Sequence, residues 1–248
     1  MPARLAAFAL AVLALCSPAT ASETITLTFD RSGERLPGVP SAFLARSEPF
    51  ATPEGVRQRS DVRYDSYSVF GRSFGEIMKS VDENGVRSAG RQKRTPSAFD
   101  WVTGLSFTYD YTYEIAEDDD MAVVALEVIE LKRQDRFRIT LPHLVNDTAL
   151  NPIELSLFQD FSAKLLEQEH RRMEVVRDEE IWNALRDGIL RLQVFKVTLV
   201  EGMDIERTIE SIITQEAVRL GRERARRVQE RMKDFEQKAA PPGHPAGR

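Results

Sequence analysis

Apolar and polar residues alternate with a period of two through the middle of the chain. From Phe99 to Ile115 the odd positions are apolar or aromatic except at Thr103, and the even positions are mostly polar or small. A run of this length predicts one long strand whose aromatic face packs inward. Met121 to Leu131 is also typical of a strand, so the acidic stretch 117–120 predicts the turn of an antiparallel hairpin. That stretch lacks the glycine and ligand spacing of a calcium loop, which favours a hydrated turn.

Shorter elements are expected around this hairpin. Apolar alternation predicts three short strands, at Thr24–Phe29, Val62–Phe70 and Phe137–Leu141. Ser73 is placed to cap a short helix from Phe74 to Val81, which the Asn84-Gly85 pair closes. The segment 31–59 is rich in Pro, Gly and Ser and has no sustained period, which predicts an irregular arm.

In the last third of the chain the apolar spacing changes to three and four residues, which predicts two long helices. The first begins at Pro152, with Asn151 as its cap, and ends at about Asp187. The second runs roughly from Ile205 to Gln237 and has a dense Arg/Glu outer face. The segment 190–200 between them is expected to be a strand or an irregular link.

Together these elements predict an α+β fold, in which a small antiparallel sheet with a long hairpin packs on two long helices. We expect one α+β domain at 62–238, preceded by an N-terminal strand and irregular arm at 22–61. The tail 239–248 contains three prolines and is expected to be disordered.

The first 21 residues have the organisation of a secretory signal. Arg4 precedes an apolar run that ends at Leu15, and a small-residue triplet ends at Ala21. This pattern predicts cleavage after Ala21 and a periplasmic or secreted protein. The run is too short to span a membrane, and no later stretch is long enough. Cys16 is the single cysteine and lies inside the signal, so the mature chain would lack disulfides and thiolate metal sites. A lipid anchor on Cys16 is the rival interpretation, less favoured because the bulky Leu15 precedes it.

Charge narrows the choice of partners. The chain has 34 Lys+Arg and 39 Asp+Glu, a formal net charge of −5, and loss of Arg4 with the signal would make it −6. An acidic total argues against general nucleic-acid binding. The basic stretch 87–94 has no interleaved aromatic residues, so a solvated loop is a better interpretation than an anion site.

The first long helix carries the candidate chemistry. The pentad Leu166-Glu167-Gln168-Glu169-His170 differs from a zinc-protease helix motif in its first position, where leucine replaces histidine. In the intact motif two histidines one turn apart bind zinc and the glutamate acts as general base. Glu167 is therefore the candidate catalytic residue and His170 the candidate metal ligand. Glu174 is a further candidate ligand, because Glu167, His170 and Glu174 share one helix face.

This cluster has two other interpretations. Glu167 and His170 also match the Glu-x-x-His pair of di-metal bundles, but the second long helix has no histidine to supply a matching pair. Spacing by itself favours a plain surface cluster, in which imidazole and carboxylates hydrogen-bond to one another. His143, expected in a turn after Pro142, and His244 in the tail reach this helix only if the fold brings them close.

The order of features resembles a bacterial domain-of-unknown-function family described as predicted secreted zinc-dependent proteases. The resemblance covers roughly Val62 to Asp187. It rests on a Tyr-rich strand that runs into Val-Phe-Gly and a short helix, a basic loop to Thr95, an aromatic strand from Trp101, a strand closing at Leu141-Pro142, and the Leu-Glu-Gln-Glu-His helix.

The family resemblance implies a zincin-like helix pair and a His-Glu-x-x-His motif. By position, Glu167 then matches the general base, His170 a zinc ligand, and Leu166 replaces the other ligand. A further histidine, expected in a His-Gly context near the end of the second helix, has no counterpart after Phe235. A catalytic zinc usually has three protein ligands, so two probable ligands are missing.

The leading hypothesis is a secreted or periplasmic protein on this protease scaffold that is catalytically degenerate and has a binding or structural role. It would hold no cofactor, and its partner would be a peptide or protein. The first alternative is an active zinc metallopeptidase that recruits His143 or an acidic residue as substitute ligand. The second alternative is a cell-envelope interaction module that acts through the Arg/Glu-rich second helix.

Overall fold

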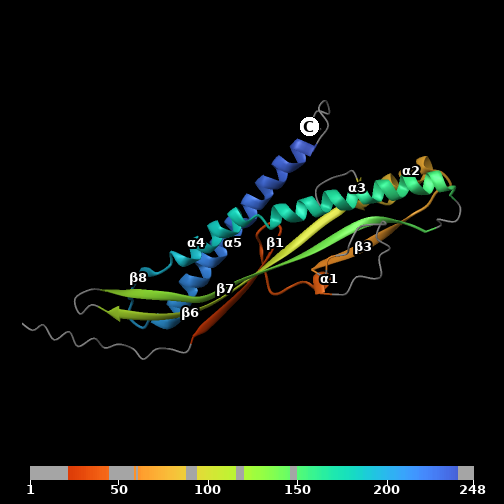
Figure 1. The fold of residues 1–248 in the computed structure, drawn as a ribbon. Helices are drawn as coiled ribbons and strands as arrows, with labels where there is room; N and C mark the ends of the chain where they lie inside the picture. The colour runs from red at the N-terminus through yellow and green to blue at the C-terminus, as the bar shows by residue number, and fades with distance from the viewer. Residues whose placement is uncertain are drawn as a thin grey trace, which may run out of the picture.

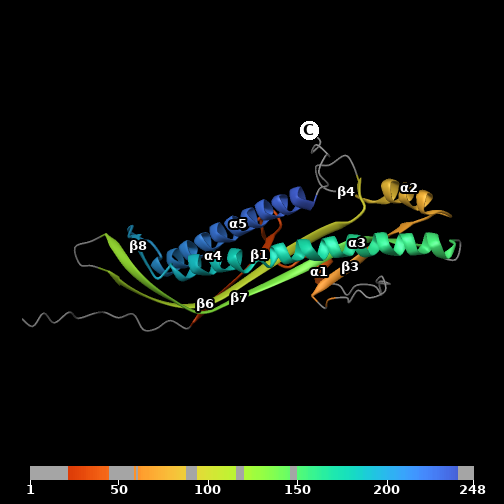
Figure 2. The same cartoon turned by 45° about the horizontal axis from the view of Figure 1, so that its top comes forward.

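The computed structural model describes residues 22–44, 59, 61–87, 94–115, 120–145 and 150–239. The predicted signal, the predicted tail from 240 and most of the basic and acidic loops lie outside these residues. The described chain has an elongated α+β fold, in which helices cover one face of a long, twisted sheet (Figures 1 and 2). None of its helices combines the length and apolar character needed to cross a bilayer.

The hairpin of β6 (Ala98–Ile115) and β7 (Met121–Leu144) extends through the whole sheet. The two strands pair from Ala98↔Thr140 to Ile115↔Ala122, with a bulge at Thr108/Tyr109. The prediction for β6 is confirmed. The prediction of a separate strand at Phe137–Leu141 is wrong, because these residues continue β7 without a break. The polar stretch 132–136 hides this continuity, since its residues Arg133 and Asp135 form ion pairs instead of apolar contacts.

The main sheet has the order β2-β1-β6-β7-β3, and β8 also pairs with β7. All pairings in it are antiparallel except that of β3 with β7. The β1 strand pairs with β6 over its full length, so β1 is part of the main sheet. The remaining strands are β1 (Glu23–Asp30), β2 (Arg35–Leu36), β3 (Val62–Val69), β8 (Val194–Thr198), and the separate pair β4 (Val86–Arg87) and β5 (Arg94–Thr95).

The helices are α1 (Ser41–Leu44), α2 (Phe74–Asn84), α3 (Pro152–Val176), α4 (Glu179–Leu190) and α5 (Ile205–Ala239). Ser73 and Asn151 cap α2 and α3 as expected. The single long helix predicted to reach Asp187 is wrong, because it is two helices. Asp178 separates them, since its carboxylate accepts the backbone N–H groups of Glu180 and Ile181 and so starts α4. The prediction of α5 is confirmed.

Three apolar clusters lie along the sheet. The first joins β1, β6 and β7 to α4 and α5, the second joins β3, β6 and β7 to α3, and the third lies between α2 and the start of α3. Figure 2 shows α3, α4 and α5 on the same side of the hairpin. The helices α3 and α4 lie one after the other, and α3 contributes to both the second and the third cluster.

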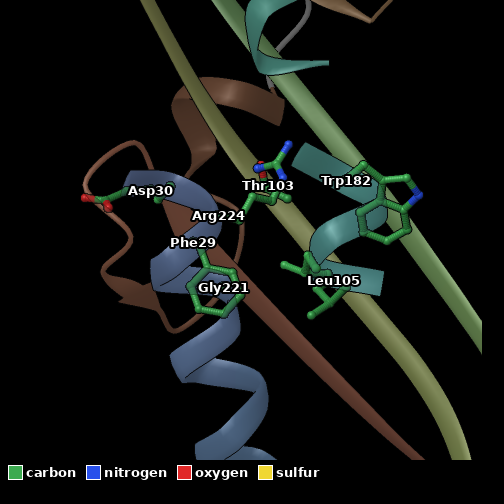
Figure 3. Close-up of a pocket in the computed structure, with 9 residues that line it drawn as sticks. Phe29, Asp30, Thr103, Leu105, Trp182, Gly221 and Arg224 are labelled. Carbon is green, nitrogen blue, oxygen red and sulfur yellow. The ribbon is translucent and has the colours of Figure 1, made fainter. Parts of the chain in front are cut away.

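Arg224 of α5 lies where the first two clusters meet. Its guanidinium is 4% exposed and donates to the Thr103 hydroxyl at 2.7 Å, the Asp135 carboxylate at 3.2 Å and the Val176 carbonyl at 3.0 Å. Figure 3 shows the side chain beside Thr103 of β6, and nearby Phe29 of β1 against Gly221 of α5. A Cβ atom at Gly221 would overlap the Phe29 ring, so glycine allows this close approach of helix and sheet.

We expect Arg224→Ala to lower the free energy of unfolding by roughly 3–5 kcal/mol, because it leaves the Asp135 carboxylate buried without its main helix partner. Arg226→Ala, an exposed arginine of the same helix, should change it by less than about 0.5 kcal/mol. Urea denaturation of both variants measures the difference. Equal stability of the two variants would show that the buried pair does not join the clusters.

Candidate functional site

The motif helix α3 places Leu166 in the apolar core. The side chain is 0% exposed and belongs to the cluster that contains Tyr64 of β3 and Ile139 of β7. In the zinc-dependent protease family that the sequence resembles, this position would hold a zinc ligand. Here it is a packing position under the sheet, and leucine fills it.

Glu167, the candidate general base, is on the solvent side of α3. Its carboxylate is exposed and forms an ion pair with Arg171 one turn later. The structure therefore does not bring Glu167 and His170 to a common site. An exposed i,i+4 pair of this kind is an ordinary feature of a helix surface.

His170 is half-buried against β3. Its Nε2 atom lies 3.0 Å from the hydroxyl of Tyr64, and that hydroxyl also accepts the backbone N–H of Arg59 at 3.3 Å. Burial and the nearby charge of Arg59 lower the pKa of His170 below its ordinary value, and Glu174 partly offsets this shift. The environment thus favours the neutral imidazole, which is held by a hydrogen bond to tyrosine.

Glu174 is engaged by arginines. Its carboxylate lies 2.9 Å from the Arg59 guanidinium and 3.9 Å from that of Arg177. Arg177 also pairs with Asp61 and stacks on the Phe137 ring, with 4.8 Å from its Cζ to the ring centre. These contacts form a cross-link between α3, β7 and the chain entering β3.

The residues on and around α3 do not fit zinc. Among the described residues, no group of three His, Cys, Asp or Glu side chains is placed to hold a metal ion. His143 does not supply the missing ligand. It is not in a turn but in β7, paired with Ser68 and exposed. His244 lies outside the described residues.

Sequence reasoning missed Glu169. It is 0% exposed, accepts the Ser97 hydroxyl, and receives two hydrogen bonds from Arg172 at 2.9 and 3.0 Å. Arg172 also binds Glu236 of α5 at 3.0 Å. A signal was present, because Glu169 lies four residues after Leu165 on the apolar stripe of the helix. A carboxylate at that position requires a partner, which Arg172 provides from the next turn.

This buried carboxylate lies beneath an open groove of about 510 Å³, here called the α3–α5 groove. Its walls are α3, the last turns of α5 and the chain from Thr95 into β6. The apolar lining includes Phe99, Trp101, Leu165 and Met232. The charged lining residues are Arg31, Arg172, Lys233 and Glu236.

Only one of these charged residues lacks a charged partner among the described residues. Arg172 and Glu236 bind each other, and Arg31 lies close enough to Asp100 to stabilise its carboxylate. Lys233 is exposed at the rim and forms no ion pair within the described chain. The groove therefore offers an apolar floor, several polar side chains and one available cation.

No family model, curated protein or solved structure matches this chain. The resemblance to secreted zinc-dependent proteases and the zincin-like helix pair stay predictions. We therefore define the candidate site from this chain alone. It consists of the α3–α5 groove and the α3 side chains beneath it.

Protein purified without chelator is expected to contain less than about 0.1 equivalent of zinc, because two or fewer potential ligands meet near His170. Elemental analysis measures the content, and the melting temperature should be the same with and without EDTA. The matched variant is His170→Ala. Stoichiometric zinc that disappears in this variant would support the metallopeptidase instead.

The free energy of unfolding is expected to fall as the pH drops below about 6.5, the ordinary pKa of histidine. The reason is that the lowered pKa of folded His170 makes the unfolded chain bind more protons in that window. His170→Gln should flatten the curve between pH 5 and 7 in urea titrations. His143→Gln, a change at an exposed strand position, should retain the parent's slope. A parent that becomes more stable on acidification would contradict the assignment.

Proposed function

We propose that this protein is an exported, non-catalytic binding protein that holds an extended peptide segment of a partner in the α3–α5 groove. The observation that carries the proposal is the groove itself, with aromatic side chains on its floor and one unpaired lysine at its rim. Sites for small molecules are usually enclosed and mostly apolar. An open groove with a mixed lining suits a chain that contributes both backbone polar groups and side chains.

The state of the motif helix supports a binding role over catalysis. Leu166 serves packing, Glu167 pairs with Arg171 in solvent, and His170 is hydrogen-bonded to Tyr64. Each residue of the former motif thus has a structural partner. We infer a degenerate protease scaffold, whose helix keeps its place in the fold while its chemistry is lost.

Export is part of the proposal. The predicted cleavage after Ala21 leaves one residue, Ser22, before β1, which begins at Glu23 and pairs with the central strand β6. Cleavage there would remove the apolar segment without cutting into the sheet. We therefore propose a mature chain from Ser22, located in the periplasm or outside the cell.

The outer face of α5 is a weaker candidate for partner binding. Its charged residues satisfy one another along the helix, as in the pairs Arg226–Glu230 and Arg227–Glu223. Such pairs are typical of a solvated helix surface. The envelope-module hypothesis therefore has less support than binding in the α3–α5 groove.

A fluorescein-labelled heptapeptide of alternating valine and threonine with one central glutamate tests the proposal. We expect Lys233→Glu to weaken its binding about tenfold, equivalent to about 1.4 kcal/mol, because attraction at the rim becomes repulsion. Fluorescence anisotropy measures the dissociation constants. Lys238→Glu makes the same charge change on the same helix but outside the groove lining, and should bind like the parent. Equal effects of the two variants, or no binding by the parent, would refute the proposal.

A further inference from the structure

Among the described strands, none pairs with one edge of β6 beside the groove. The ladder between β1 and β6 ends at Asp30↔Val102, whereas β6 continues to pair with β7 as far as Ala98↔Thr140. Beyond Asp30 the chain turns sharply, with Gly33 at φ 83°, and returns as β2. Between Ala98 and Trp101, therefore, β6 has a described strand on its β7 side only.

The direction of the backbone amides shows which N–H and C=O groups of β6 face away from β7. The Trp101 N–H donates to the carboxylate of the adjacent Asp100 at 3.0 Å, so it does not point to β7. Backbone groups of successive residues alternate between the two sides of an antiparallel strand. The polar backbone groups of Phe99 and Trp101 therefore face the open edge. Both residues, together with Ser97 and Ala98, line the α3–α5 groove.

Asp100 covers this edge. Its carboxylate occupies the Trp101 N–H, and it is partly buried, which raises its pKa, while the charges of Arg31 and Arg138 oppose the rise. Proteins commonly place charged side chains at open sheet edges, because an uncovered row of amides pairs with other chains. A carboxylate on the strand's own amide can be displaced by a better-aligned backbone carbonyl.

We propose that β6 accepts a partner's extended peptide as an added strand along Ala98–Trp101, and that Asp100 covers the edge until the peptide displaces its carboxylate. This inference rests on the proposed function and specifies its mode. Four residues of strand span about 14 Å, so a short peptide is sufficient. Main-chain hydrogen bonds would supply affinity with little dependence on sequence, as in other strand-addition complexes.

The charges around the edge define the class of peptide. Lys233 at the rim is available for one carboxylate, whereas Asp100 beside the edge would repel a second. The preferred occupant is therefore an extended segment with a single acidic residue. Asp100 disfavours a polyacidic chain, and Lys233 disfavours a basic one.

Two N-methylated versions of the valine–threonine heptapeptide test strand addition. In each version, the methyl groups block the backbone amides along one edge of the extended peptide. The central glutamate, by pairing with Lys233, sets the register of the peptide along β6. One version should bind at least tenfold more weakly than the parent peptide, and the other within about threefold. If both versions bind like the parent, strand addition is wrong while groove binding stands. If the parent peptide itself does not bind, the proposed function fails.

The same binding assay tests separately whether the Asp100 carboxylate covers the edge of β6. Asp100→Ala frees the Trp101 N–H, and one hydrogen bond of about 0.5–1.5 kcal/mol corresponds to roughly 2- to 10-fold tighter binding. Glu114→Ala, at an exposed position far along β6, should leave binding unchanged. Unchanged or weaker binding by the Asp100 variant would show that this carboxylate does not cover the edge.

Discussion

The guanidinium of Arg224 connects the two halves of this fold. The β6–β7 hairpin is too long for any one helix to cover, so separate helices cover successive parts of it. Arg224 lies at the junction and binds β6 through Thr103, β7 through Asp135 and the end of α3 through the Val176 carbonyl. A buried ion pair contributes little by its net energy, but it is costly to break. The Arg224–Asp135 pair therefore fixes the position of α5 relative to the strands at this point.

From that junction α3 extends over the β3 side of the sheet and serves three purposes at once. Leu166 packs inward, His170 bonds to Tyr64 on one side, and Glu169 supports the groove on the other through Arg172. The helix thus keeps the central place that its motif indicates. These side chains make structural contacts, and the proposed binding site is the groove next to the helix.

The groove exists because β1 turns away before β6 ends. The same turn leaves one edge of β6 without a partner among the described strands, and an open edge is an aggregation hazard unless it is covered. The carboxylate of Asp100 covers one amide there without closing the groove. The Asp100 carboxylate covers the edge of β6 without blocking it. This arrangement is consistent with the proposal that a partner strand replaces the hydrogen bond between Asp100 and the Trp101 N–H.

Local pattern determined the long strand β6, the caps Ser73 and Asn151, and the helix α5, because periodicity and capping depend on residues close in sequence. Only the tertiary structure decided that β7 is continuous, that Glu169 is buried, and that His170 meets Tyr64 across 106 positions. The physical reason is the same in each case. A polar residue looks solvent-exposed in sequence, and its burial becomes stable only when distant segments bring it a partner.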